Sequence, residues 1–249
     1  MNYSGHVHEV FGSFQGEGTL VGERHIFVRL CGCNLSCDFC DTEEATGARS
    51  PAAWFEEGPG LAPTAVPNPV DVGRVVEAVL AQEAFSGFNA ALCLTGGEPL
   101  MQPVFIGGLL EALAGRFRVV LETNGTLAEA FRKVAARIDV VSMDIKLPSA
   151  YGGRALWKKH EEFLRAVDGR ETVVKVVVSN ATTASELDKA ARLVGSISPD
   201  SVFVIQPMTG GRGVSELTGG KLLELYTAAK KRLKYVRVIP QTHKMLGVK

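Results

Sequence analysis

Residues 26–42 read Ile26-Phe-Val-Arg-Leu-Cys-Gly-Cys33-Asn-Leu-Ser-Cys37-Asp-Phe-Cys40-Asp-Thr42, a strand-like apolar run that leads into a cysteine-rich loop. Three of its cysteines, Cys33, Cys37 and Cys40, are separated by three and then two residues. A [4Fe-4S] cluster that only transfers electrons takes four cysteine thiolates, so a set of three leaves one iron for a non-protein ligand. The spacing therefore predicts an iron-sulfur cluster with an open iron, where the chemistry takes place.

The ligand that such an iron usually takes is S-adenosylmethionine. Its reductive cleavage gives a 5'-deoxyadenosyl radical, which abstracts hydrogen from unactivated carbon as amino-acid side chains alone cannot. We therefore expect a radical enzyme in which the protein positions and shields the reactants.

Cys31 adds a fourth thiol to the same stretch, which makes a zinc site an alternative. Structural zinc sites usually pair two Cys-x2-Cys knuckles across a longer segment, and this sequence has no second knuckle. Five cysteines are an odd number and the first residues are polar, so we expect neither a disulfide framework nor a signal peptide. We interpret Cys31 as a bystander and Cys93, between Leu92 and Leu94, as a small buried hydrophobe.

The composition is that of a globular domain with a neutral surface. The chain has 249 residues, of which 46% are hydrophobic, and we expect a single (β/α) domain spanning residues 1–249. The formal net charge is zero and the pI is near 7.0, which predicts a small-molecule substrate and no direct nucleic-acid partner. Apolar runs such as 173–178 are too short to span a membrane, so we expect a cytoplasmic protein, where reducing conditions suit exposed thiolates.

Short β-branched runs alternate with amphipathic stretches, a pattern typical of a parallel sheet with crossover helices. The expected strands are 26–30, 90–94, 117–122, 138–145, 172–178, 202–206 and 235–239. The expected helices are 104–114, 127–136, 158–167 and 216–232, one that follows Asp71 as its cap, and one behind a capping box of Thr183 and Glu186. Residues 47–70 are rich in Pro, Gly and Ala without periodicity, which predicts a loop or irregular insertion.

About six β/α units in this length predict a partial or modified (β/α)6 TIM-type barrel, in which function collects at the carboxyl ends of the strands. Polar motifs follow successive expected strands and should converge on one rim. These motifs are the cysteine loop, Thr95–Pro99, Glu122–Gly125, Ser142–Lys146, Lys175 with Ser179-Asn180, and Gln206–Met208.

Gly96 and Gly97 let the backbone approach a ligand closely, and Gly97-Glu98 can present hydrogen-bonding groups to the amino group of a bound amino acid. The alternative is a tight turn between strand and helix. Thr123 and Asn124 have the same two interpretations, as cofactor contacts or as turn residues around Gly125. Coming one strand after a three-cysteine loop, the glycine segment resembles that of the radical S-adenosylmethionine superfamily, whose members use it to hold the methionine moiety.

Further motifs resemble one family within that superfamily, the 7-carboxy-7-deazaguanine synthases. They are Phe14-Gln-Gly-Glu-Gly18, Phe27–Leu30, Gly32–Leu35, Cys40-Asp-Thr42 and Gln241-Thr-His-Lys244, so that the likeness runs from residue 11 to residue 249. One segment departs from it, because Ser142-Met-Asp-Ile-Lys146 has two extra residues and an acidic side chain where the family has Ser-Pro-Lys.

The resemblance implies a lyase that converts 6-carboxy-5,6,7,8-tetrahydropterin into 7-carboxy-7-deazaguanine with loss of ammonia, a step toward queuosine and other deazapurines. It also implies a [4Fe-4S] cluster, S-adenosylmethionine, Mg2+, a flavodoxin- or ferredoxin-type reductant and a homodimer. No catalytic residue is implied beyond the cluster and cofactor.

Carried over position by position, the resemblance places at the substrate Phe14, Gln15, Gly16, Arg29, Thr95 and the terminal carboxylate of Lys249. It places at S-adenosylmethionine Phe39, Cys40, Asp41, Gly97, Ser142, Asp144, Lys146 and Gln206. It assigns the cluster to Cys33, Cys37 and Cys40, and the magnesium ion to the hydroxyl of Thr42, a hard oxygen ligand.

Two rival functions remain open. A glycyl-radical-enzyme activase would use the same first cluster, although many such activases carry additional cysteine-rich segments and residues 47–70 contain no cysteine. A zinc or iron-sulfur module with a structural role would leave the gathering of polar motifs on one rim unexplained. We interpret His6 and His8 as packed or solvated side chains of an edge strand rather than metal ligands, and His243 as a structural hydrogen-bonding residue.

Overall fold

The computed structural model describes residues 3–58, 61–86, 91–167, 169–209 and 217–249. The strands are β1 (Ser4–Gly5), β2 (Val7–Phe14), β3 (Arg24–Leu30), β4 (Ala52–Phe55), β5 (Thr64–Pro67), β6 (Val70–Asp71), β7 (Ala91–Gly96), β8 (Val119–Thr123), β9 (Val140–Asp144), β10 (Glu171–Val178), β11 (Val202–Pro207) and β12 (Val236–Val238). The helices are α1 (Val72–Ser86), α2 (Pro103–Ala112), α3 (Ala128–Val134), α4 (Pro148–Tyr151), α5 (Trp157–Val167), α6 (Ala184–Ile197), α7 (Gly219–Lys230) and α8 (Thr242–Leu246).

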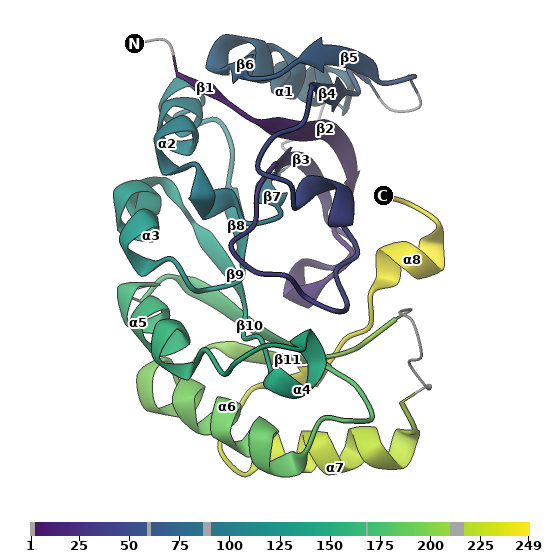
Figure 1. Cartoon of the computed structure of the whole chain (residues 1–249), viewed down its shortest axis with the longest axis vertical. Helices are drawn as coiled ribbons and strands as arrows, with labels where there is room; N and C mark the ends of the chain where they lie inside the picture. Colours follow the sequence, from purple (N-terminus) through teal and green to yellow (C-terminus); the bar gives the residue numbers. More distant parts are fainter. Residues whose placement is uncertain (1–2, 59–60, 87–90, 168, 210–216) are drawn as a thin grey trace.

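One curved sheet carries the fold, with the strand order β12-β11-β10-β9-β8-β7-β3-β2-β4-β5. The strands from β3 to β12 pair in parallel, each with the next in the chain apart from the β4–β6 excursion. Helices α1, α2, α3, α5, α6 and α7 follow successive parallel strands and cover the outer face of the sheet (Figure 1). Because β12 and β5 do not pair, the barrel is open, and the predicted partial (β/α)6 barrel is confirmed.

The parallel strands bury both faces, and side-chain alternation divides the core in two. Along β3, Ile26 and Val28 join the large cluster under the helices, whereas Phe27 joins a smaller cluster inside the barrel. Cys93 and Val120 are the inward residues of β7 and β8 in the same way. Because side chains alternate with a period of two, the next inward positions toward the carboxyl ends include Arg29, Thr95, Glu122 and Ser142, which are polar.

Helix starts agree with the predicted caps, with one difference. The Asp71 carboxylate accepts from the Gly73 N–H at 2.7 Å at the start of α1, and the Thr183 hydroxyl accepts from the Glu186 N–H at 3.2 Å at the start of α6. Glu186 does not complete the capping box, because its carboxylate accepts instead from the Ser149 N–H at 3.0 Å. The expected helix 216–232 is α7, although residue 216 lies outside the described residues.

The interpretation of residues 47–70 as a loop or irregular insertion was wrong. Within this segment β4 and β5 form an antiparallel hairpin, and β4 extends the main sheet by pairing with β2. Ala53 and Phe55 are fully buried while Trp54 is 46% exposed, an alternation over four residues that is too short to detect in an alanine-rich sequence.

The edge-strand interpretation of the first histidines also needs correction. They belong to β2 or precede it directly, and β2 lies between β3 and β4 rather than at an edge. The strand continues to Phe14, just before the glycine-containing motif, because it pairs with β3 as far as Phe14 and Arg24. Along this ladder Phe11 stacks on Phe27 with ring centroids 5.0 Å apart.

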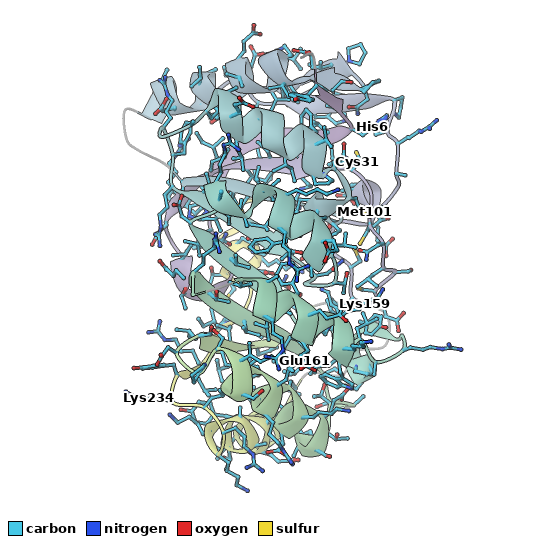
Figure 2. The ribbon with its side chains drawn as sticks, turned by 90° about the vertical axis from the view of Figure 1, so that its left-hand side faces the viewer. His6, Cys31, Met101, Lys159, Glu161 and Lys234 are labelled. Carbon is cyan, nitrogen blue, oxygen red and sulfur yellow. The ribbon has the colours of Figure 1, made fainter. Side chains whose placement is uncertain are left out.

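Figure 2 turns the helical layer toward the viewer and labels Lys159 and Glu161 on α5. Lys159 is solvent-exposed, and Glu161 pairs with Arg165 one turn along the same helix. Among the described residues, no helix combines the length and the apolar character that crossing a membrane requires.

Candidate active site

A cavity of about 500 Å³ opens at the carboxyl ends of the parallel strands. Every residue that the sequence assigned to a ligand lines it: Phe14, Gln15, Gly16, Arg29, Cys33, Cys37, Phe39, Cys40, Asp41, Thr42, Thr95, Gly97, Ser142, Asp144, Lys146, Gln206 and Lys249. The structure therefore brings them together in one place, while the contact that each makes with a ligand stays a prediction.

The cysteine loop presents three thiols to this cavity. Cys33, Cys37 and Cys40 are half-buried and free, and all three line the cavity. Cys31 is only 1% exposed and is not among the lining residues, which agrees with its interpretation as a bystander. Burial raises the pKa of the Cys37 thiol to about 11, so a cation is needed to hold its thiolate form. Three such thiols on one loop fit an iron-sulfur cluster.

The glycine turn packs directly on the cysteine loop. Gly96 has φ +143°, and a Cβ on it would lie 2.2 Å from the Leu30 carbonyl oxygen. A Cβ on Gly97 would lie 2.5 Å from the Gly32 carbonyl oxygen. Both positions therefore need glycine for the close approach of two backbones, in addition to any approach by a ligand.

The side chain of Glu98 belongs to the turn after β7 and is not among the residues that line the cavity. It is fully buried and accepts hydrogen bonds from the Thr123 hydroxyl at 2.8 Å and from the Asn124 N–H at 2.7 Å. Burial raises the pKa of Glu98 to about 7 despite these donors. The carboxyl thus links the turn after β7 to the turn after β8. Thr123 and Asn124 have this structural role and also line the cavity.

Ion pairs run along the rim from the amino-terminal loop to β9. Lys175 on β10 pairs with Glu17 and lies 3.6 Å from the Asp144 carboxylate, which in turn accepts from Lys146 at 2.7 Å. Burial alone would raise the pKa of Glu17, but the Lys175 ammonium and amide donors from two glutamines lower it to about 2. Glu17 is therefore a carboxylate throughout the physiological range.

Two buried acceptor atoms along this rim have no hydrogen-bond partner within the described part of the chain. They are Oδ1 of Asp144 and Oε1 of Gln206, and both residues line the cavity. An unpaired buried acceptor costs free energy until a donor reaches it. The ribose hydroxyls, the adenine amino group and the amino group of S-adenosylmethionine are such donors, so these residues fit that cofactor.

His160 of α5 supports the same rim from behind. Its Nε2 atom accepts from the Lys146 N–H at 3.2 Å, so its Nδ1–H donates to the Gly125 carbonyl at 3.1 Å. Burial lowers the pKa of His160 to about 4, which keeps the ring neutral and this pattern intact.

The opposite wall carries the residues assigned to the substrate. The Arg29 guanidinium donates to Glu9 at 2.8 Å and lies 5.5 Å from the centroid of the Phe11 ring. The Gln15 amide donates to the Glu122 carboxylate at 2.9 Å. Glu9 on the adjacent strand β2 thus holds Arg29, and Glu122 on β8 holds Gln15 from across the barrel.

One group of possible metal ligands lies beside the cysteine loop. Atoms of Glu17, Asp41 and His243 lie within 4.8 Å of one another. Both carboxylates already have lysine partners, Lys175 for Glu17 and Lys244 for Asp41, so these groups are not left for a cation. Thr42, the predicted magnesium ligand, has its hydroxyl 3.9 Å from the Cys40 sulfur.

Sequence reasoning missed several contacts of this site. Glu122 was expected on the rim, but its hydrogen bond with Gln15 was not. The pairing of Glu17 with Lys175 and the role of His160 had no local signal, because each depends on contacts with a distant segment.

The comparisons with known proteins agree with this geometry. The Radical SAM superfamily matches residues 28–194, which contain the cysteine loop and strands β7 to β10. The 7-carboxy-7-deazaguanine synthase of Geobacter sulfurreducens is 37% identical over 243 residues, covering 97% of this chain and 96% of the relative. This chain belongs to the 7-carboxy-7-deazaguanine synthase family.

A second relative of that name, from Thermococcus kodakarensis, is 36% identical over 256 residues and covers 96% of this chain and 97% of its own length. Among solved structures, QueE from Escherichia coli matches with a TM-score of 0.54 at 20% identity, over 97% of this chain and 94% of that one. A radical SAM methyltransferase from Sphaerobacter thermophilus matches with a TM-score of 0.56 at 13% identity, over 88% and 70%. These two structural likenesses concern the fold.

Proposed function

We propose that this protein converts 6-carboxy-5,6,7,8-tetrahydropterin into 7-carboxy-7-deazaguanine with loss of ammonia. One observation carries the proposal: the three-cysteine loop, the Gln15–Glu17 loop and the carboxyl-terminal segment line the same cavity. A glycyl-radical-enzyme activase does not require the two ends of the chain to lie at one cavity. A structural zinc or iron-sulfur module does not require it either.

Cys33, Cys37 and Cys40 would hold the cluster, which with S-adenosylmethionine would supply 5'-deoxyadenosyl radical chemistry for hydrogen abstraction from the substrate. Asp144 and Gln206 offer their unpaired oxygens to the cofactor. Arg29, held by Glu9, directs its remaining N–H groups toward the substrate carboxylate, the anion that a guanidinium fork binds best. Thr42 would hold Mg2+ through its hydroxyl, a hard oxygen ligand, and the ion would help to bind and orient the substrate.

The decisive experiment is anaerobic reconstitution of the cluster, followed by reduction and addition of S-adenosylmethionine, Mg2+ and the carboxypterin. The proposal expects 5'-deoxyadenosine and the deazaguanine product together. Formation of 5'-deoxyadenosine without the deazaguanine would contradict the substrate assignment while leaving radical chemistry in place. Omission of Mg2+ tests the role of the ion, with Thr42→Val as the matched variant that removes only the hydroxyl.

We also propose a flavodoxin- or ferredoxin-type electron donor, a homodimer, and use of the product in queuosine-type tRNA modification, on the strength of the family resemblance. Light scattering in solution tests the dimer, and reduction of the cluster by each purified donor tests the reductant.

A further inference from the structure

The primary amide of Gln241 lies between two carboxylates that belong to different loops. Its Nε2 atom donates to Glu17 Oε1 at 2.6 Å and to Asp41 Oδ2 at 2.8 Å. Its Oε1 atom accepts from Lys244 Nζ at 2.8 Å and from the Thr209 hydroxyl. Gln241 is 7% exposed, and both of its amide hydrogens and its oxygen are used.

The two carboxylates stand beside the residues assigned to different ligands. Glu17 directly follows Gln15 and Gly16 of the substrate wall, whereas Asp41 lies between Cys40 and Thr42 of the cluster loop. These two loops are joined to the carboxyl-terminal segment by contacts that span 224 and 200 residues of sequence.

Residues 241–249, the carboxyl-terminal segment, are also bonded to the loop of residues 15–17, the substrate loop. The Thr242 N–H donates to the Gly16 carbonyl at 2.9 Å, and a Cβ on Gly16 would lie 2.2 Å from Nδ1 of His243. Figure 1 shows this yellow segment, with α8, returning to the purple amino-terminal strand. Gln241 thus occupies a defined position rather than a mobile tail.

A primary amide suits this position because it donates on one side and accepts on the other. Two carboxylates face it, and an amide nitrogen gives each of them a hydrogen. A carboxylate in its place would add a third negative charge to Glu17 and Asp41, with Lys175 and Lys244 as the cations facing the group. The two hydrogens on its amide nitrogen, one for each carboxylate, therefore explain why residue 241 is a glutamine.

We propose that Gln241 is a positioning residue that holds the substrate loop and the cluster loop together, so that binding of the substrate and binding of S-adenosylmethionine are energetically coupled through the carboxyl-terminal segment. The coupling rests on the proposed function, whereas the joining of the two loops does not. Coupling is reciprocal, so each ligand should tighten the binding of the other by the same factor.

Three variants test this in the reconstituted enzyme. Gln241→Glu keeps the shape and adds the third carboxylate, and Gln241→Met removes both donors without adding charge. Asp41→Asn combined with Gln241→Glu exchanges the amide and the carboxylate and restores a donor–acceptor pair between residues 41 and 241, whereas the carboxylate at 241 still faces that of Glu17. Hydrogen exchange of residues 12–18 and 33–42 reports on the loops, with β8 as the internal reference, and the affinity for S-adenosylmethionine is measured with and without the carboxypterin.

We expect Gln241→Glu to raise exchange in both loops roughly 10-fold or more and to abolish the gain in S-adenosylmethionine affinity on adding substrate. Gln241→Met should have a smaller effect of the same kind. The exchanged pair should recover protection in residues 33–42, where the contact with residue 41 is restored, but not in residues 12–18, where Glu17 still faces a carboxylate. Unchanged exchange in Gln241→Glu, or no recovery of residues 33–42 in the exchanged pair, overturns the proposal. If the wild-type enzyme does not use the carboxypterin, the proposed function fails, while the loop exchange still decides the role of Gln241.

Discussion

His160 is the residue whose chemistry is most narrowly determined by its surroundings. It is fully buried, and its two ring nitrogens join the Lys146 N–H to the Gly125 carbonyl. Protonation of the ring would turn Nε2 from an acceptor into a donor facing another donor. The residue therefore acts through the backbone of the rim, and only as a neutral imidazole.

This makes the free energy of unfolding depend on pH. The pKa of His160 is about 4 when folded, against about 6.5 for a free histidine, so its contribution is complete above about pH 6.5 and declines as the pH falls toward 4. The full decline is worth roughly 3 kcal/mol. His160→Gln, which keeps one acceptor and one donor without titrating, should flatten this dependence in urea unfolding between pH 7 and pH 4.5. Equal slopes for wild type and variant would contradict it.

The cysteines give a second prediction at the same scale. Cys33→Ala, Cys37→Ala and Cys40→Ala should each prevent incorporation of the cluster, because each removes one of the thiols at the cavity. Cys31→Ala is the matched control, since its thiol is buried and outside the cavity. Iron and sulfide content after anaerobic reconstitution measures the effect, and loss of the cluster in Cys31→Ala would show that the ligand set is wrong.

Among the elements, α6 has two side chains in its first turn region with different roles. Thr183 caps its first turn, while Glu186 reaches across to the Ser149 N–H at the start of α4. Thr183→Ala should lower the free energy of unfolding by about 1 kcal/mol, and Thr183→Ser should retain most of it. Urea unfolding at pH 7 measures both, and an equal loss in the serine variant would assign the effect to packing of the methyl group instead.

The elements also show where periodicity succeeds and fails. The parallel strands were predictable because they are near-continuous apolar runs, buried on both faces, and their helices because their apolar residues recur every 3.6 residues. The β4–β5 hairpin was not, since its strands are four residues long and its buried positions include alanine. Its place in the sheet depends on β2, which no local pattern connects to it.

At the scale of the whole molecule, the Glu17–Lys175 ion pair joins segments 158 residues apart across the cavity. The Lys175 ammonium keeps the pKa of Glu17 near 2, below the usual 4.5, although burial acts in the opposite direction. This contribution is complete above about pH 4.5 and is lost as the pH falls toward 2.

Removing one partner of the Glu17–Lys175 pair should lower the free energy of unfolding far more than removing both. Lys175→Met leaves a buried carboxylate without its cation and should cost about 3–5 kcal/mol of unfolding free energy. Adding Glu17→Gln removes that charge and should recover most of the loss. A double-mutant cycle from urea unfolding at pH 7 measures the coupling, and additive losses would mean that the pair is not formed in solution.

The sequence by itself determined the order of the parallel strands and their covering helices, and the rim on which the polar motifs gather. It could do so because side-chain periodicity is local and because parallel strands all end at the same edge of a sheet. The family motifs likewise sit in contiguous stretches of sequence.

Only the tertiary structure decided which polar groups meet. Gln241 with Asp41, Glu17 with Lys175, and His160 with Lys146 each depend on how two separately folded segments dock. The same holds for Glu98, because no local pattern showed that its carboxyl is buried between the turns after β7 and β8. A hydrogen bond depends on distance and direction in space, and neither follows from the spacing of residues that are far apart along the chain.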